Sequence, residues 1–462
     1  MKTKYPILFF IIILIVSCSS DEGNDYVALP IVANSDAAQV FQNQFVEIDV
    51  LSNDENIPTN GILTVSTPAN GSVEVIDANN TPSNPSDDII LYTPNDTFLG
   101  EVTFNYTICD NLSNCATETV TVTVMDPSPV NINLNQVPYP TLSEYNFYEG
   151  NMANLQPVFG VLPYELITPL FTDYALKKRF VWMPNGQKAT YTSDSEIFNF
   201  PTGTVLIKNF YYNNVLPNNT TRIIETRLLI KKANEWIFAE YIWNEAQTEA
   251  TLDVSGNGGF LEIEWLQNGE PKSVNYRIPS QFECLTCHKQ QVNAIPIGPK
   301  PQNINSIFNY EDGSQNQLSK WESMGYLNSN YPSSIQTTVN WEDTSQPLEL
   351  RVRSYFDVNC AHCHMDLGHC DYRPIRLAFN ESSDPTNLGV CVEPEDDITP
   401  FLNGENPTHI VFPGDIQKSV TYFRLNTQEE NVKMPLIGRS LIHEEGVDLL
   451  INWINSLQSS CE

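Results

Sequence analysis

Two short segments of the chain, residues 284–288 and 360–364, have the pattern Cys-x-x-Cys-His. At this spacing two thiols bond covalently to the vinyl groups of a haem, and the adjoining imidazole ligates the iron. Two copies in a chain with ten cysteines and six histidines exceed what chance provides. The pattern therefore predicts two covalently bound haem c groups. The predicted attachment residues are Cys284, Cys287, Cys360 and Cys363, and the predicted proximal iron ligands are His288 and His364.

The second motif is followed by the elements of a small haem domain. Leu348, Val352 and Phe356 have helical spacing and lead into Cys360. A Met-Pro loop and a C-terminal amphipathic helix follow. This order resembles a class I cytochrome c domain, and the resemblance implies that Met434 is the distal ligand, which would raise the reduction potential. Three basic residues are candidates to pair with haem propionates, with a surface charge as the alternative role: Arg373, Arg376 and Arg424.

The surroundings of the first motif are less complete. Small c-type cytochromes carry a Gly-Pro turn about this far past the haem histidine, and Pro299 stands in a similar turn. The resemblance implies that its carbonyl accepts a hydrogen bond from His288, with an ordinary Pro-rich loop as the alternative. Met324, in a predicted helix, is either a distal ligand or a core residue. His409 and His443 are further candidates if the modules share a face, and the iron is otherwise five-coordinate.

The N-terminus has the features of an export signal. A positively charged start precedes a short apolar core, and residues 15–18 resemble a bacterial lipobox, whose cysteine is lipidated. The acidic run that follows resembles the export tag of surface lipoproteins in the Bacteroidota. The sequence predicts a signal peptide over residues 1–18, lipidation at Cys18 and a tether over 19–28, with a plain secretory signal as the alternative. The predicted location is the outer membrane or cell surface, facing the periplasm or exterior.

The chain is strongly acidic, with a formal net charge of −32 from 24 basic and 56 acidic side chains. Such a surface repels phosphate backbones and anionic headgroups. Nucleic acid is therefore excluded as a partner, and membrane contact is expected only through the lipid anchor. The predicted partners are a redox protein donor and acceptor. A basic partner suits this surface, although acidity is also ordinary for an exported protein.

The remaining cysteines predict disulfides, because exported chains meet an oxidising environment. Cys109 and Cys115 lie on either side of a turn and predict a hairpin disulfide. Cys370 and Cys391 are the preferred second pair, with Cys461 free, although the sequence leaves this pairing open.

Residues 29–126 consist of short alternating strands separated by Asn, Asp, Gly and Pro, which predicts a two-sheet sandwich. Residues 49–54, 92–94 and 98–100 resemble those of bacterial Ig-like and cadherin-like modules. Three oxygen-donating residues either hold a turn or bind calcium: Asp49, Asn53 and Asp54.

The rest of the chain divides into four predicted regions. These are a linker over residues 127–140, a β-rich domain over 141–280, a first haem module over 281–345 and a second over 346–462. Four charged residues of the β-rich domain lie beside aromatic residues, and a solvated strand face explains them as well as a functional role does: Asp173, Lys177, Lys178 and Arg179. The predicted fold class is multidomain: an all-β Ig-like sandwich, then a β-rich domain, then mostly α cytochrome c-like haem modules.

From about residue 141 to its end, the chain resembles a family of largely uncharacterised bacterial dihaem c-type proteins. The matching runs are residues 170–175, 225–229, 241–245 and 359–364 and the Met-Pro segment. The resemblance implies two haems and supplies no reaction, and the Ig-like segment lies outside it.

The sequence therefore predicts a membrane-anchored dihaem c-type cytochrome that transfers electrons. One alternative is a dihaem cytochrome c peroxidase-like oxidoreductase, in which a His/Met haem feeds a reactive five-coordinate one. Another is a cell-surface binding or scaffold lipoprotein that uses its β domains. No acid or base suited to O–O cleavage is evident, so an electron carrier is favoured over a catalyst and no catalytic residue is predicted.

Overall fold

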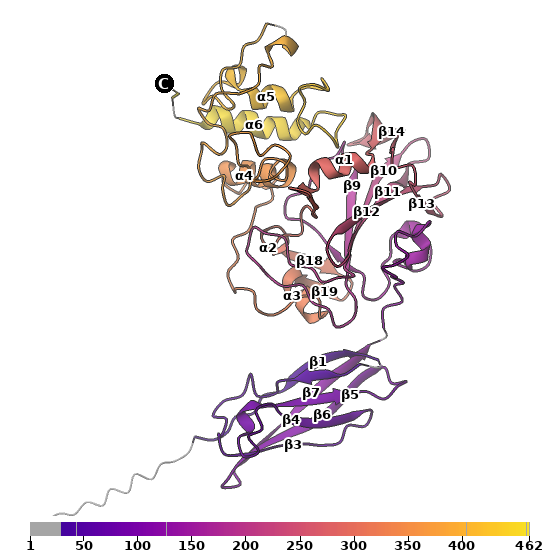
Figure 1. Cartoon of the computed structure of the whole chain (residues 1–462), viewed down its shortest axis with the longest axis vertical. Coiled ribbons are helices and arrows are strands. Elements are labelled where there is room, and N and C mark those ends of the chain that lie inside the picture. Colours follow the sequence, from indigo (N-terminus) through magenta and orange to yellow (C-terminus); the bar gives the residue numbers. More distant parts are fainter. Residues whose placement is uncertain (1–28, 43, 126, 403, 459, 462) are drawn as a thin grey trace, which may run out of the picture. The chain divides into compact units, whose positions relative to one another are not determined.

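The chain is described from a computed structural model, which covers residues 29–42, 44–125, 127–402, 404–458 and 460–461. Its contacts divide the chain into two compact units, residues 1–125 and 126–462 (Figure 1). The predicted signal peptide and lipidation site at Cys18 lie outside the described residues. Within the described ranges no helix has the length and apolar character needed to cross a membrane.

The first unit is a β-sandwich. Its sheets have the strand orders β1-β7-β6-β3 and β2-β5-β4. Ile90 and Tyr92 of one sheet share a core with Val102, Phe104 and Val122 of the other, because alternate residues of each strand face inward. This confirms the predicted two-sheet sandwich. The elements are β1 (Asp36–Phe41), β2 (Val46–Ile48), β3 (Gly61–Val65), β4 (Ser72–Asp77), η1 (Pro85–Asp87), β5 (Asp88–Thr93), β6 (Gly100–Asp110) and β7 (Cys115–Met125).

The second unit is built on an eight-stranded sheet. Its main strand order is β13-β12-β11-β10-β14-β15, and β9 pairs with β10 and with β8. The first half of β10 lies beside β9, whereas its last residue, Val215, pairs with Trp265 of β14, so the sheet branches at β10. The strands are β8 (Leu162–Tyr164), β9 (Leu176–Trp182), β10 (Val205–Val215), β11 (Thr220–Lys231), β12 (Trp236–Trp243), β13 (Ala250–Leu252), β14 (Gly259–Gln267) and β15 (Glu270–Ile278).

The two faces of this sheet are covered by different parts of the chain. One face packs on the segment that precedes β8, which contains η2 (Leu142–Tyr145) and η3 (Met152–Asn154). Val137 and Tyr139, from the predicted linker, are buried in that core. The other face carries Val181, Leu206 and Leu229, which pack against α2 and α3 farther along the chain.

The prediction of mostly α, cytochrome c-like haem modules is wrong. Strands predominate in the described chain, and of its six α-helices only α4, with 12 residues, and α6, with 13, are longer than two turns. Residues 360–415 are rich in Asn, Asp, Gly and Pro, which favour turns over helix. The elements are α1 (Gln281–Cys287), β16 (Lys289–Gln290), β17 (Asn293–Ala294), α2 (Pro301–Ile304), β18 (Ile307–Tyr310), β19 (Gly313–Asn316), α3 (Gln317–Ser323), α4 (Leu348–Asn359), η4 (Thr399–Phe401), η5 (Ile416–Lys418), α5 (Val420–Leu425) and α6 (Glu444–Ser456).

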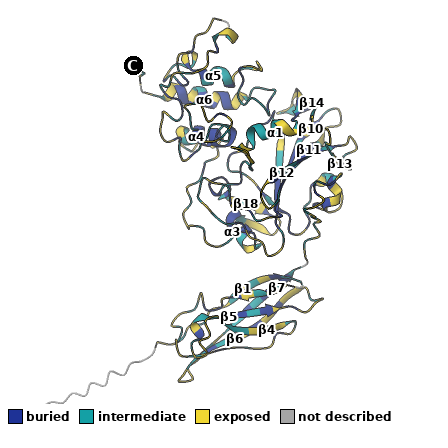
Figure 2. Ribbon diagram, viewed as in Figure 1, coloured by how far each residue is buried: buried dark blue, intermediate teal, exposed yellow. Residues whose placement is uncertain are grey.

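The two longer helices pack against each other and form the core around the second motif. Val352 and Phe356 of α4 share this core with Val447, Leu450 and Trp453 of α6. Buried and exposed residues alternate along α6 in the manner of an amphipathic helix (Figure 2). Both helices agree with the apolar spacing in the sequence.

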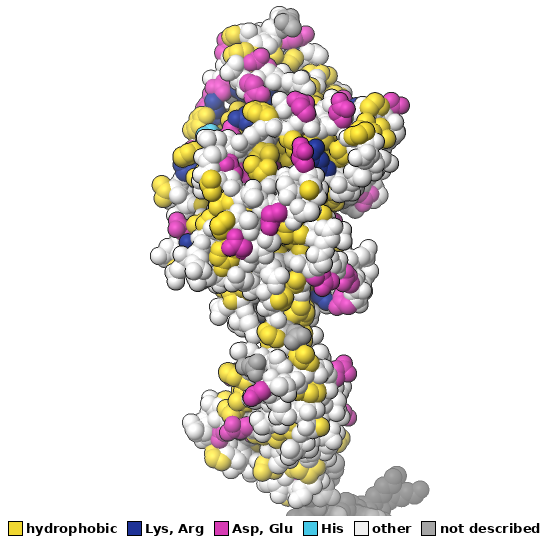
Figure 3. Space-filling view, turned by 90° about the vertical axis from the view of Figure 1, so that its right-hand side faces the viewer, with side chains coloured by type: hydrophobic (Ala, Val, Ile, Leu, Met, Phe, Trp, Pro, Cys, Tyr) yellow, Lys and Arg dark blue, Asp and Glu magenta, His cyan; other side chains and the backbone are white. Residues whose placement is uncertain are grey.

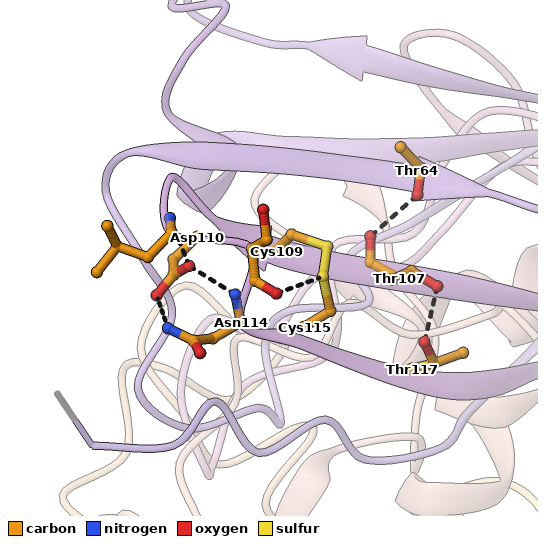
Figure 4. The surroundings of a disulfide bond; sticks show 9 residues. Thr64, Thr107, Cys109, Asp110, Asn114, Cys115 and Thr117 are labelled. Carbon is orange, nitrogen blue, oxygen red and sulfur yellow. Dashed lines mark hydrogen bonds between the residues drawn. A yellow bond between two sulfur atoms is a disulfide. The ribbon is translucent and has the colours of Figure 1, made fainter.

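Two disulfides are present among the described cysteines. Cys109–Cys115 joins β6 to β7, as predicted, beside a turn in which Asn114 donates a hydrogen bond to Asp110 over 2.8 Å (Figure 4). The preferred pair Cys370–Cys391 is wrong, because Cys391 is bonded to Cys461 and Cys370 is a buried free thiol. Cys391 and Cys461 are 70 residues apart in the sequence, and they meet because α6 brings the C-terminal residues back to Cys391.

We expect Cys461→Ser to lower the free energy of unfolding of the second unit by about 4 kcal/mol, because it opens a long loop. Cys370→Ser is the matched control and should leave the disulfide intact. Urea unfolding measures the loss, and peptide mapping without reductant identifies the pairs. Recovery of a Cys370–Cys391 peptide would contradict the structure.

Candidate functional site

The two Cys-x-x-Cys-His segments lie side by side in the second unit. The backbone N–H of Gln291, just after the first motif, donates to the carbonyl of Leu367, just after the second, over 2.8 Å. The Cys363 sulfur lies 4.0 Å from the carbonyl oxygen of Thr286. Segments far apart in the sequence are thus joined by direct contacts.

Thiols and an imidazole gather where the motifs meet. The ligand atoms of Cys287, His362 and Cys363 all lie within 4.8 Å of one another, close enough to hold a metal ion. A hydrogen bond with Cys363 lowers the pKa of Cys287, and the same bond raises the pKa of Cys363. By contrast, burial raises the pKa of Cys284 to about 11 and that of Cys360 to about 12. The motif pattern assigns no role to His362, and only the tertiary structure reveals this contact.

A cavity of about 280 Å³ opens beside the second motif. Four of the residues that line it are those predicted for the second haem: Cys360, Cys363, His364 and Met434. Its other walls are largely apolar and include Phe356, Leu377, Leu388, Ile410 and Leu425. The structure therefore brings together the predicted attachment residues, proximal ligand and distal ligand around one space. His369 and the free thiol of Cys370 also line it, and the sequence analysis assigned neither to this site.

His364 is positioned by the end of α4. The helix stops at Asn359, and the backbone N–H groups of Cys360 and His364 then donate to Phe356 and Cys360, at 2.8 and 3.1 Å. Within the described part of the chain, Nδ1 of His364 is buried and has no hydrogen-bond partner. Burial lowers the pKa of His364 to about 4, so the imidazole is neutral near pH 7. A neutral imidazole is the form that ligates iron.

Two of the three predicted propionate partners reach the same cavity. Arg373 and Arg424 line it, and both pair with Asp396, Arg424 at 3.1 Å. Arg373 also meets Glu395 at 3.2 Å. Arg376 instead pairs with Asp366 at 2.7 Å and does not line this cavity. The acidic partners on this rim were not apparent from the sequence, because they come from a separate loop.

The Met434 loop is held by hydrogen bonds that its main-chain N–H and carbonyl groups make. The Met434 N–H donates to the Arg424 carbonyl over 2.8 Å, and Arg439 Nε donates to the Met434 carbonyl over 2.8 Å. Lys433 Nζ donates to the Arg439 carbonyl over 3.0 Å. The methionine is therefore fixed on the wall of the cavity by its own backbone.

The segment before β9 links this loop to the second motif. Asp173 is 2% exposed, and its Oδ1 accepts hydrogen bonds from the N–H groups of Ser440 and Leu441, at 2.6 and 2.7 Å. Two residues earlier, the Phe171 N–H donates to Oδ1 of Asn359 over 2.9 Å. Asp173 was explained from the sequence as part of a solvated strand face, and that explanation is wrong, since it is buried as a loop anchor.

A second buried carboxylate joins the regions around the two motifs. Asp357, in the last turn of α4, has a side chain that is 1% exposed. It accepts hydrogen bonds from Lys300 at 3.3 Å, from Gln302 at 3.1 Å and from the Phe379 N–H at 3.0 Å. The predicted first and second haem modules are consequently connected through this side chain.

The first motif is carried by α1, which begins with a capping box between Ser280 and Glu283. His288 follows the helix, and its Nδ1 lies 2.9 Å from the carbonyl oxygen of Ile295. The prediction of Pro299 as this acceptor is therefore wrong. The hairpin β16–β17 reverses the chain within a few residues, and the Ile295 N–H also donates to the His288 carbonyl over 3.0 Å.

The candidate distal ligands of the first haem lie in other settings. Met324 follows α3 and packs against the core around Trp321. His409 is hydrogen-bonded through Nδ1 to Thr408 at 2.9 Å. His443 stacks on Phe171, with ring centroids 4.0 Å apart. Met324 and His443 therefore pack against other side chains, and His409 is hydrogen-bonded to its neighbour.

The acidic turn of the first unit is held by hydrogen bonds. Asp54 accepts them from the Asn34 N–H at 2.7 Å and from the Tyr106 hydroxyl at 2.8 Å. Asn53 donates its amide to the Ser35 carbonyl over 3.2 Å, and the Asp49 carbonyl accepts from the Ser52 hydroxyl over 2.9 Å. These contacts are those of the turn-holding alternative stated above for Asp49, Asn53 and Asp54.

On the face of the surface visible in Figure 3, acidic side chains outnumber basic ones, in keeping with the net charge of −32.

Comparison with known proteins identifies the first unit. Residues 24–123 match the bacterial Ig domain family, so this part of the chain is an Ig-like domain. No curated protein matches the chain. A solved 2,6-sialyltransferase of Photobacterium sp. JT-ISH-224, in complex with CMP and lactose, shares 15% identity with a TM-score of 0.16, covering 21% of this chain and 18% of its own. A likeness of that size carries no argument about fold or function.

We expect Asp173→Ala to lower the free energy of unfolding by roughly 2 to 4 kcal/mol, because two buried N–H groups lose their acceptor. Asp173→Asn keeps an acceptor oxygen at the same place and should lose much less. Urea unfolding of the two variants measures the difference. Equal losses would show that the Asp173 oxygen is not what anchors the loop.

Proposed function

We propose that residues 126–462 carry two covalently attached haem groups and that the protein transfers electrons through them between redox partners. The main support is the cavity of the second motif, which is lined by both thiols, the imidazole and the thioether expected from the sequence. Residues far apart in the sequence line this cavity, from Thr286 to Ile437. A haem would supply a one-electron iron couple at each motif.

The residues of the second motif fit such a group. His364 lines the cavity and offers a neutral imidazole. Met434 offers a thioether, which favours ferrous iron and a higher potential. The largely apolar walls suit the apolar ring of a haem, and Arg373 and Arg424 lie on the rim, where both are paired with Asp396.

The first motif fits a haem on its proximal side. The contact between His288 Nδ1 and the Ile295 carbonyl favours a proton on Nδ1 and leaves Nε2 to ligate iron. Burial is the main cause, and the charge of Lys208 the second, that lowers the pKa of His288 to about 3. This imidazole is therefore also neutral. The direct contacts between the motifs favour exchange of electrons between the two groups.

The setting of this activity is also part of the proposal. The N-terminal pattern supports a lipid-anchored protein at the outer membrane or cell surface, attached through Cys18. The acidic chain suits basic donor and acceptor proteins. The Ig-like domain would act as a spacer or binding module between the anchor and the haem-bearing unit.

A second candidate function is metal binding without haem. It is favoured by the close approach of Cys287, His362 and Cys363, since thiolate and imidazole ligands suit zinc. This site and haem attachment compete for the same two thiols, so both cannot occupy one chain.

Haem and zinc content decide between these functions. We expect pyridine haemochrome spectra of the full chain to give two haems, because each motif has two thiols. Cys284→Ser with Cys287→Ser should leave one, as should Cys360→Ser with Cys363→Ser. Cys370→Ser, a cysteine near both motifs but in neither, is the control and should retain two.

Fewer than two haems in the unmodified chain would overturn the proposal, and stoichiometric zinc in their place would establish the metal site. Hydrogen peroxide then separates a carrier from a peroxidase. The reduced carrier should react slowly and without sustained turnover, whereas an enzyme would consume peroxide continuously.

We expect Met434→Ala to remove the weak methionine-to-iron absorption band and to lower the reduction potential of the second haem, because the thioether ligand is lost. Met324→Ala is the matched control, since this methionine packs in a core, and it should leave the band unchanged. Optical redox titration measures both effects. A band that persists in Met434→Ala would assign the distal ligand elsewhere.

A further inference from the structure

One face of the eight-stranded sheet carries a row of basic residues. The strand register pairs Arg179 of β9 with Lys208 of β10, and Lys208 with Arg227 of β11. Residues paired directly across strands lie on the same face. Lys177 lies on this face too, because it stands two residues from Arg179 on the same strand. Lys177, Lys208 and Arg227 all approach the ring of Phe210, at 6.0, 4.9 and 4.3 Å.

Most of these cations have no acidic partner. Arg227 pairs with Glu225 at 2.5 Å, and it is the one member of the row with an ion pair among the described residues. Arg179 is 7% exposed, and its Nη2 is buried without a hydrogen-bond partner in the described chain. Lys177 donates only to a backbone carbonyl, that of Ala175, at 2.6 Å. Unpaired buried charge is costly, so the row calls for a counter-ion.

The acids on the face do not supply that counter-ion. Glu225 is shared between Arg227 and the Tyr276 hydroxyl, which donates to it over 2.7 Å. Glu240 lies 3.7 Å from Nε of Arg227 and forms no ion pair with Lys177, Arg179 or Lys208 among the described residues, and burial raises its pKa. Burial and the neighbouring arginines hold the pKa of Lys208 well below its usual range, and a bound anion would offset this effect.

The row lies beside the first motif. Helix α1 packs against β12, the strand next to β11 (Figure 1). The ring of Phe238 on β12 meets the ring of His288, with centroids 5.1 Å apart. Lys208 and Arg227 are also close enough for their charges to act on His288. A ligand on the row would therefore be next to the first Cys-x-x-Cys-His segment.

We propose that Lys177, Arg179, Lys208 and Arg227 form an anion site that binds a carboxylate or another oxyanion next to the first motif. Guanidinium and ammonium groups bind such oxygens through short, charge-assisted hydrogen bonds. The oxyanion has two sources of the same chemistry: a propionate of the first haem, which rests on the proposed function, or a free oxyanion from solution.

The decisive variant is Lys208→Met, which keeps the length of the side chain and removes its charge. The matched control is Lys178→Met on the neighbouring strand β9, whose ammonium lies on the opposite face of the sheet and donates to the Leu155 carbonyl over 3.0 Å. Each is made in the full chain, and thermal unfolding confirms that it folds. If no anion binds, loss of an unpaired buried charge should stabilise Lys208→Met, and that result counts against the site.

The two sources give different results. For a free oxyanion, calorimetry should detect binding of inorganic phosphate to the unmodified chain, weakened about tenfold or more in Lys208→Met and unchanged in Lys178→Met. For a haem propionate, the loaded protein should not bind phosphate, and the resonance Raman propionate bending band should shift only in Lys208→Met. Absence of both effects overturns the proposal. A chain without haem would refute the proposed function, while the phosphate titration would still test the anion site.

Discussion

The hydrogen bonds that Asp357 accepts in the last turn of α4 are the interaction on which the arrangement of the two motifs depends. The carboxylate holds Lys300 and Gln302, which follow the first motif, and the Phe379 backbone, which follows the second. Long irregular segments around residues 360–415 have few regular hydrogen bonds of their own. A buried charge with several donors gives such segments a defined position, because an unsatisfied carboxylate at that place would be costly.

Asp173 has the same role on the other side of the second motif. It belongs to the sheet-bearing part of the chain but satisfies the backbone of the loop that carries Met434. Proximal and distal sides of the cavity are therefore fixed to one framework through Asn359 and Asp173. The cavity is a product of the β-rich part as much as of the helices, which explains why its fold differs from a separate helical module.

Local patterns were predicted well from the sequence, and long-range relations were not. The β-rich character of residues 141–280 and the helices α4 and α6 follow from apolar periodicity, which acts over a few residues. Ile295 could not be identified as the acceptor from the family pattern, which points to the Gly-Pro turn, because the short hairpin β16–β17 places the Ile295 carbonyl next to His288. The disulfide of Cys391 depends on the return of the C-terminal segment. The basic row around Lys208 depends on which strands pair with one another. Residue spacing in the sequence predicts neither. For the candidate site, the motif residues and Met434 were identified, while His362, Cys370 and the acidic rim required the fold.

The second unit gathers positive charges on one face of its sheet, although the chain as a whole is acidic. The protein has 24 basic side chains against 56 acidic ones, yet four of those cations lie on one sheet face, where Arg179 is buried and one of its nitrogens has no partner in the described chain. Surface acidity is inexpensive in water, whereas buried positive charge persists only where something offsets it. These cations are few, but they lie together on neighbouring strands of one sheet face.

The meeting of Cys287 and Cys363 has a consequence for how the protein is made. Two neighbouring thiols can form a disulfide when an oxidant is present, and the hydrogen bond with Cys363 lowers the pKa of Cys287, which favours the reactive form of this thiol. If the chain folds before its thiols are used, an oxidising compartment would cross-link one motif to the other and block both. If the proposed haem attachment is correct, it must therefore take place while these sulfurs are still reduced.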